Sequence, residues 1–147
     1  MKVINEMKLT FDSKSSNEAF ARGAVSSFVV QLDPTIAELS DIKTAVSEAV
    51  TNAIVHGYSN TIGTVTIKVQ ITENNTVIIQ VKDKGVGIEN IPQAMEPMFT
   101  TGGSERAGLG FAVMQSFMDK VKVISKPNKG TTVTMEKYIM PRVSART

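Results

Sequence analysis

The sequence predicts an α+β two-layer sandwich, in which a mixed, mostly antiparallel sheet is covered on one face by three helices. Segments that alternate apolar and polar residues are typical of strands buried on one face. They occur before, between and after segments with apolar residues at helical spacing, which are typical of amphipathic helices. The order is strand, helix, helix, strand, strand, long loop, helix, strand, strand. Helices on one face of a sheet bury all of these apolar faces most simply.

The first third of the chain predicts a strand and two helices. Alternation predicts an edge strand over 3–11, and an N-cap at 15–17 begins a helix that runs to about Leu32. The Asp33–Pro34 pair ends this helix, because the residue before a proline avoids helical geometry. A second helix starts near Thr35, and Gly57 lies where its C-cap belongs.

The remaining elements follow the same logic. Alternation predicts four strands, at 65–71, 77–81, 120–125 and 131–138. The first two form a hairpin around the turn at 73–75. A glycine-rich loop of functional length covers 84–107, and a third helix covers 108–118. We expect residues 1–140 to form a single domain, fraying from Ile139, with a flexible tail over 141–147.

Composition excludes several classes of function. The chain has 147 residues and a net charge of +2, which is too small to predict nucleic-acid binding from bulk electrostatics. It has no cysteine and one histidine, so thiolate and multi-histidine metal sites are excluded. No stretch approaches the roughly 20 apolar residues that span a bilayer, and the start does not read as a signal peptide. We therefore expect a cytoplasmic protein with no membrane partner.

Glu48, Asn52 and His56 recur every four residues on the second predicted helix, so they share one face. A buried amide needs a partner, and the Asn52 oxygen suits either a neighbouring helix or Mg²⁺, which accompanies phosphates. Beside such a metal, Glu48 would polarise a hydroxyl or water. The alternative is that the pair only caps or links helices, and we expect His56 to be structural.

Two glycine-rich segments follow. Asp83 ends a predicted strand and precedes Gly85 and Gly87, which leave backbone bare for a flat ring, while the carboxylate suits the amine of adenine. Such a carboxylate is also a common turn former. Gly108–Gly110 opens the third predicted helix, whose free amides would bind phosphate, and Arg106 is a cation in the preceding lid. The alternative is a disordered surface loop, and the segment is not a P-loop.

Together, in this order, these segments resemble the nucleotide-binding boxes of the GHKL (Bergerat) superfamily of ATPases and kinases. Stretches outside the boxes also resemble its anti-sigma serine kinases, the sporulation branch in particular: 17–22, 31–34, 97–101 and 117–119. The resemblance implies ATP/ADP and Mg²⁺ as cofactors, a homodimer, a sigma factor (sigma-F) that is sequestered, and an anti-anti-sigma protein that is phosphorylated on serine.

The resemblance also assigns roles. It makes Glu48 the general base, Asn52 the Mg²⁺ ligand and Arg22, expected to point to solvent, a contact to both protein partners. It implies nucleotide contacts from Asn52, Asp83, Gly85, Gly87, Thr100, Thr101, Arg106, Gly108, Leu109, Gly110, Thr131 and Thr132. The lid departs from the family pattern, being one residue shorter and lacking its proline, which weakens the role of Arg106.

Three alternatives stay open. A histidine-kinase catalytic domain needs a phosphoacceptor histidine on a separate helix, whereas the one histidine here lies in the Asn52 helix. A nucleotide-gated binding module without kinase activity would not need Glu48. A general-stress anti-sigma kinase would share the chemistry and differ in its sigma factor, although the stretch from Phe99 to Gly110 favours the sporulation branch.

Overall fold

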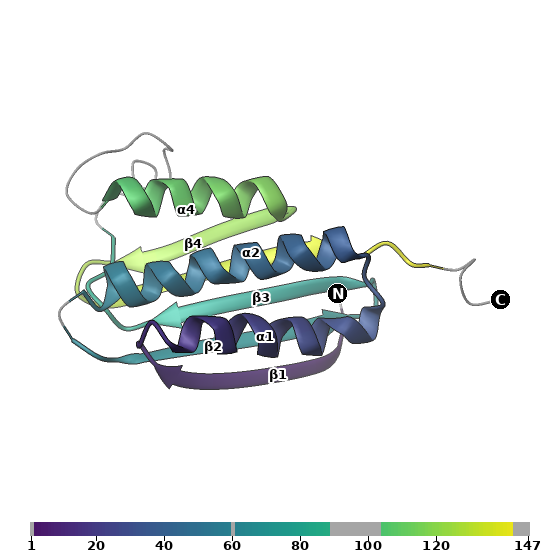
Figure 1. The fold of residues 1–147 in the computed structure, drawn as a ribbon, viewed down its shortest axis with the longest axis horizontal. Helices are drawn as coiled ribbons and strands as arrows, with labels where there is room; N and C mark the ends of the chain where they lie inside the picture. Colours follow the sequence, from purple (N-terminus) through teal and green to yellow (C-terminus); the bar gives the residue numbers. More distant parts are fainter. Residues whose placement is uncertain (1, 60, 89–103, 143–147) are drawn as a thin grey trace.

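A computed structural model describes residues 2–59, 61–88 and 104–142, and of residues 104–108 it describes the backbone alone. Figure 1 shows a sheet with helices along one face. In chain order the elements are β1 (Val3–Asp12), α1 (Asn17–Val29), η1 (Val30–Leu32), α2 (Ile36–Asn52), η2 (Ala53–Gly57), β2 (Thr64–Thr72), β3 (Thr76–Asp83), α4 (Ser104–Phe117), β4 (Lys120–Lys126) and β5 (Gly130–Tyr138).

The five strands form one sheet in the order β1-β2-β3-β5-β4. All four pairings are antiparallel, with registers such as Val69 opposite Ile79 and Asp83 opposite Thr131. The predicted fold class is confirmed, and the sheet that we expected to be mixed is antiparallel throughout its described pairings. The order places β5, the last strand in the sequence, inside the sheet.

The hydrophobic core lies between the sheet and the three helices. Valines and isoleucines on the inner face of β2 and β3 are buried, as are Ile42, Val46 and Val50 of α2. Full burial of such a side chain contributes roughly 1.5–3 kcal/mol. No helix in the described part of the chain is long and apolar enough to cross a membrane. The core therefore stabilises the helix that carries Glu48 and Asn52.

The two helix starts differ in their caps. Thr35 accepts a hydrogen bond from the Glu38 amide at 3.0 Å, and the Glu38 side chain accepts one from the Thr35 amide at 2.8 Å. This reciprocal capping box fixes the start of α2 where the sequence predicts it. At α1 the expected N-cap is Ser16, but its side chain makes no capping hydrogen bond.

Helix α2 ends in a π-helical turn, η2, rather than in a glycine C-cap. Gly57 is its last residue, so the interpretation of Gly57 as a simple cap is wrong. A π-turn shifts the residues that follow it relative to an α-helical repeat, and such turns often lie at functional sites. His56 belongs to this turn and is half-buried.

The end of β5 is packed rather than frayed, contrary to our expectation for the chain from Ile139. Ile139 is fully buried, and its amide donates to the Asn75 carbonyl at 2.9 Å. The Met140 amide donates to the Glu38 carboxylate at 3.1 Å, which joins the end of the chain to the capping box. The division into a domain over 1–140 and a tail over 141–147 stays a prediction, since 143–147 lie outside the described residues.

Candidate nucleotide site

Asn52 occupies the last turn of α2 and is buried, with 9% of its surface exposed. Neither its Oδ1 nor its Nδ2 atom makes a hydrogen bond within the described part of the chain. An unsatisfied buried amide costs about 1–3 kcal/mol, so the fold gains nothing from this polar group. Glu48 lies one helical turn earlier and is half-buried. Asn52 therefore offers an amide oxygen that the described residues leave unbonded, with the Glu48 carboxylate one turn away.

Gly110 of α4 faces this pair. A Cβ atom placed on Gly110 would lie 3.1 Å from Glu48 Oε2, 3.1 Å from Asn52 Nδ2 and 3.2 Å from Asn52 Oδ1. These separations are tighter than an ordinary van der Waals contact. Glycine therefore lets α4 come close to α2 where the polar side chains emerge, and it brings two of the predicted segments together.

Asp83, at the end of β3, is the second buried polar group, with 6% of its surface exposed. Burial raises the pKa of its carboxyl group above the ordinary value, and hydrogen bonds from the backbone amides of Gly85 and Thr131 oppose that rise. The Gly85 bond, to Oδ1, measures 2.8 Å. Because the ionised group is held by so few donors, it is available to a ligand donor such as an amine.

The glycines around Asp83 serve packing as well as ligand access. A Cβ atom on Gly57 would meet the Asp83 carboxylate at 2.8 Å, and one on Gly85 would overlap the Gly57 carbonyl. Gly87 has a φ of +75°, and its missing side chain points at the Lys126 carbonyl. The bare sides of Gly85 and Gly87 thus face protein, which differs from the predicted open wall for a ring.

Thr131 and Thr132 lie on opposite faces of the sheet. Thr131 pairs with Asp83, its amide bonds the Asp83 carboxylate, and its hydroxyl is 2.7 Å from Ser125 Oγ. Thr132 pairs with Lys82, on the face away from the helices. Thr131 therefore shares the face of Asp83 and Thr132 does not, because neighbouring residues of a strand point to opposite faces.

The first turns of α4 also differ from expectation. The helix begins at Ser104, so Gly108 and Gly110 lie within it and Arg106 belongs to the helix backbone rather than to a loop. Leu109 is exposed. Thr100 and Thr101 lie outside the described residues, as does the side chain of Arg106.

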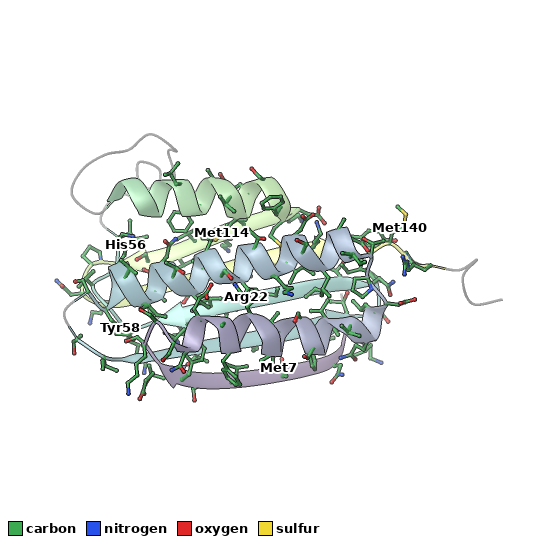
Figure 2. The ribbon with its side chains drawn as sticks, in the orientation of Figure 1. Met7, Arg22, His56, Tyr58, Met114 and Met140 are labelled. Atoms are coloured by element: carbon green, nitrogen blue, oxygen red, sulfur yellow. The ribbon has the colours of Figure 1, made fainter. Side chains whose placement is uncertain are left out.

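Arg22 is partly exposed and is also held by neighbouring side chains. Its Nη1 atom donates to Ser47 Oγ at 3.2 Å and lies 3.6 Å from Glu18 Oε1, with 40% of its side chain exposed. Figure 2 shows Arg22 between α1 and α2. It borders a groove of about 580 Å³ lined by Arg22, Ile36, Leu39, Ser40, Lys43, Thr44, Ser47 and Glu48. Glu48 thus borders both this groove and Gly110, which no helical pattern in one segment could indicate.

The site fits a metal that is held mainly by its nucleotide. Among the described residues, no three His, Cys, Asp or Glu side chains lie together as a metal-binding group. Mg²⁺ takes one or two protein oxygens and completes its shell with phosphates and water. The unbonded Asn52 Oδ1 atom, beside the space that Gly110 leaves, suits that role.

Two residues around Asp83 were given no site role from the sequence. Gly57 was interpreted as a helix cap, yet the space left by its missing side chain faces the Asp83 carboxylate. The Tyr58 hydroxyl accepts a hydrogen bond from the Lys84 amide at 2.7 Å. Gly57 and Tyr58 are the last two residues of the segment that begins at Ser47. Their position directly after the helix is the feature of the sequence that could have indicated a role at the site.

Comparisons with known proteins show the family and the fold. A family model described as a histidine kinase-like ATPase domain matches residues 12–137. The anti-sigma F factor of Thermoanaerobacter sp. (strain X514) is 59% identical over 140 residues, covering 95% of this chain and 97% of that protein. The anti-sigma F factor of Geobacillus thermodenitrificans is 54% identical over 136 residues, with 92% and 93% covered.

Solved structures share the fold. The RsbU and RsbW domains of a Mycobacterium tuberculosis protein superpose with a TM-score of 0.67 at 17% identity, over 92% of this chain and 32% of that one. A histidine kinase domain from Erythrobacter litoralis gives 0.54 at 19%, over 83% and 60%. At these identities the solved structures show the fold alone. The matched ATPase domain implies nucleotide binding. The chain belongs to the anti-sigma F factor family, with a histidine kinase-like ATPase domain that spans most of its length.

Proposed function

We propose that this protein is an ATP- and Mg²⁺-dependent serine kinase and anti-sigma factor. It sequesters sigma-F, and it phosphorylates a serine of the anti-anti-sigma protein that opposes it, acting as a homodimer. One observation carries the catalytic part: Glu48 and the unbonded Asn52 side chain face Gly110 at one point between α2 and α4. The names of the relatives support the sigma-factor part.

Asn52 would hold the metal through Oδ1, because this buried oxygen has no other partner in the described residues. When bound there, Mg²⁺ neutralises charge on the phosphates. The free amides at the start of α4 would receive phosphate oxygens, as helix N-termini commonly do. Asp83 would accept a hydrogen bond from the adenine amine, which guanine lacks at that position.

Glu48 would act as the general base in phosphoryl transfer. Its carboxylate takes the proton of the serine hydroxyl as the serine Oγ bonds the γ-phosphorus and the bond from that phosphorus to the β–γ bridging oxygen breaks. ADP leaves with that bridging oxygen. A base needs access to the acceptor as well as to the nucleotide, and Glu48 borders both the groove along α2 and the Gly110 backbone.

The groove between α1 and α2 is the proposed docking face for both protein partners, with Arg22 as a contact. The Arg22 Nη1 atom donates a hydrogen bond to Ser47 Oγ at 3.2 Å, which holds the planar guanidinium group in a fixed place. Arginine is a common interface anchor when part of its surface remains exposed. Once phosphorylated, the acceptor would gain a charge of about −1.5 to −2 next to Glu48, which would favour its release.

The test is transfer of label from γ-labelled ATP to the anti-anti-sigma protein. Glu48→Gln keeps the shape but cannot take a proton, so the rate should fall by about 10²–10⁴ while ATP affinity stays within twofold. Glu73→Gln is the matched control, since Glu73 is exposed in the turn between β2 and β3. Native rates in Glu48→Gln would remove the base role.

The same assay separates the alternatives. Absence of transfer by the native protein, with ATP-dependent sigma-F binding retained, would identify a nucleotide-gated binding module. Label on the protein's own histidine would identify a histidine kinase. Selective capture of a general-stress sigma factor in place of sigma-F would identify the other anti-sigma branch.

A further inference from the structure

Tyr58 joins two backbone segments next to the candidate nucleotide site. Its hydroxyl donates to the Thr64 carbonyl at 2.9 Å and accepts from the Lys84 amide at 2.7 Å. The side chain is buried, with 9% of its surface exposed. Figure 2 places Tyr58 near the end of α2, at the edge of the sheet where β3 ends. One hydroxyl group therefore ties the start of β2 to the residue that follows Asp83.

The Tyr58 ring is held in place from the other side by Gly63. A Cβ atom on Gly63 would overlap the ring, so the Gly63 backbone lies directly against it. Gly63 is itself fixed by Ser13, whose amide donates to the Gly63 carbonyl and whose hydroxyl accepts from the Gly63 amide, both at 2.9 Å. The phenol is thus clamped between two ordered segments, which fixes the direction of its hydroxyl.

The same backbone orients the Asp83 carboxylate. Lys84 follows Asp83 directly, and the next amide, that of Gly85, donates to Asp83 Oδ1 at 2.8 Å. On the other side the carboxylate lies against Gly57, the residue before Tyr58. Displacement of the Lys84 amide would therefore move the Gly85 donor and the carboxylate together. A binding group must be held within about 0.5 Å of its productive position, so such movement would affect recognition.

We infer that Tyr58 is a positioning residue for adenine recognition, which holds the backbone after Asp83 so that the carboxylate faces the exocyclic amine. The inference rests on the proposed role of Asp83. The inference predicts that a change at Tyr58 weakens only the part of the ATP affinity that comes from the 6-amino group, because Tyr58 is not proposed to contact the base.

The test combines one variant with two nucleotides. Tyr58→Phe removes only the hydroxyl and keeps the ring against Gly63. Binding of ATP and of purine riboside triphosphate, which lacks the 6-amino group, is measured by titration calorimetry with Mg²⁺. We expect ATP to bind about five- to tenfold more weakly, the size of one weakened hydrogen bond, and the purine nucleotide to stay within twofold. Tyr138→Phe is the matched control, since this other tyrosine is exposed.

The outcomes separate failure of the Tyr58 inference from failure of the proposed Asp83 role. If the native protein prefers ATP and Tyr58→Phe weakens both nucleotides equally, Tyr58 supports only the general shape of the pocket and the inference fails alone. If the native protein binds both nucleotides equally, the role of Asp83 fails, and the inference with it. Should Tyr58→Phe not fold, as judged by thermal unfolding, Gly63→Ala displaces the ring from the other side and should show the same selective loss.

Discussion

At its first turn, helix α2 satisfies its polar side chains within the chain, whereas at its last turn it leaves them open. Burial works to raise the pKa of Glu38, but hydrogen bonds from Thr35 and Met140 outweigh it, and the pKa is lowered. Beyond the other end of α2, Asp83 at the end of β3 lies beside Gly57, and there burial outweighs two hydrogen bonds and raises the pKa of the carboxyl group. Within the described residues, the polar groups of the first turn are therefore satisfied, whereas the buried Asn52 side chain in the last turn has no hydrogen-bond partner.

Among the predicted changes, Asp83→Asn should have the largest effect, and the quantity affected is ATP affinity. The amide can present a donor where the carboxylate accepts from the adenine amine, so ATP affinity should fall by about 30- to 150-fold. The nucleotide-free variant should melt at a higher temperature, because a costly buried charge is gone. Calorimetry and thermal unfolding measure both quantities. Unchanged ATP affinity, or equal native affinities for ATP and GTP, would contradict the adenine assignment.

The pH dependence sharpens the contrast. Asp83 must be ionised to bind the amine, so ATP affinity should fall as pH drops through its folded pKa, by up to about tenfold per unit below it. That decline should begin above the ordinary aspartate value of 3.8. The stability contributed by Asp83 runs the other way: it is present below the unfolded pKa and is lost as pH rises through the folded one. Glu38, with a lowered pKa, stabilises the fold above its unfolded pKa and loses that contribution as pH falls.

Asn52→Leu tests the proposal that Asn52, in the last turn of α2, holds Mg²⁺. Leucine fills the space of the amide without its unsatisfied atoms, so the free protein should gain about 1 kcal/mol of stability. Mg²⁺-dependent ATP binding should weaken about tenfold, equivalent to about 1.4 kcal/mol, as one ligand is lost. ATP titrations with and without Mg²⁺ measure this. Equal losses in both conditions would show that Asn52 does not hold the metal.

Thr35→Ala is the reciprocal change at the first turn and has the smallest expected effect. Loss of the cap should lower the free energy of unfolding by about 1 kcal/mol. ATP affinity should stay within twofold, because the cap lies at the opposite end of the helix from Asn52. Urea unfolding and nucleotide titration give the two values. A large loss of ATP affinity would mean that the two ends are coupled.

Local patterns predicted the elements well and the meeting of distant residues poorly. Thr35 and the alternation in β2 and β3 fix boundaries from nearby chemistry. The place of Arg22 depends on Ser47, from another helix, and Ile139 is buried because it meets Asn75 across the sheet. The sequence could have separated Thr131 from Thr132, since Val133 and Met135 already define the inner face of β5, which Thr131 shares.

The strand order has a consequence for synthesis on the ribosome. β5 lies between β3 and β4, yet it is the last strand to be translated. Until it emerges, β3 presents an open edge and β4 has no partner, and such edges favour association between nascent chains. Ribosomes that stall within the codons of β5 would therefore hold chains whose sheet lacks the β3–β5 and β5–β4 pairings.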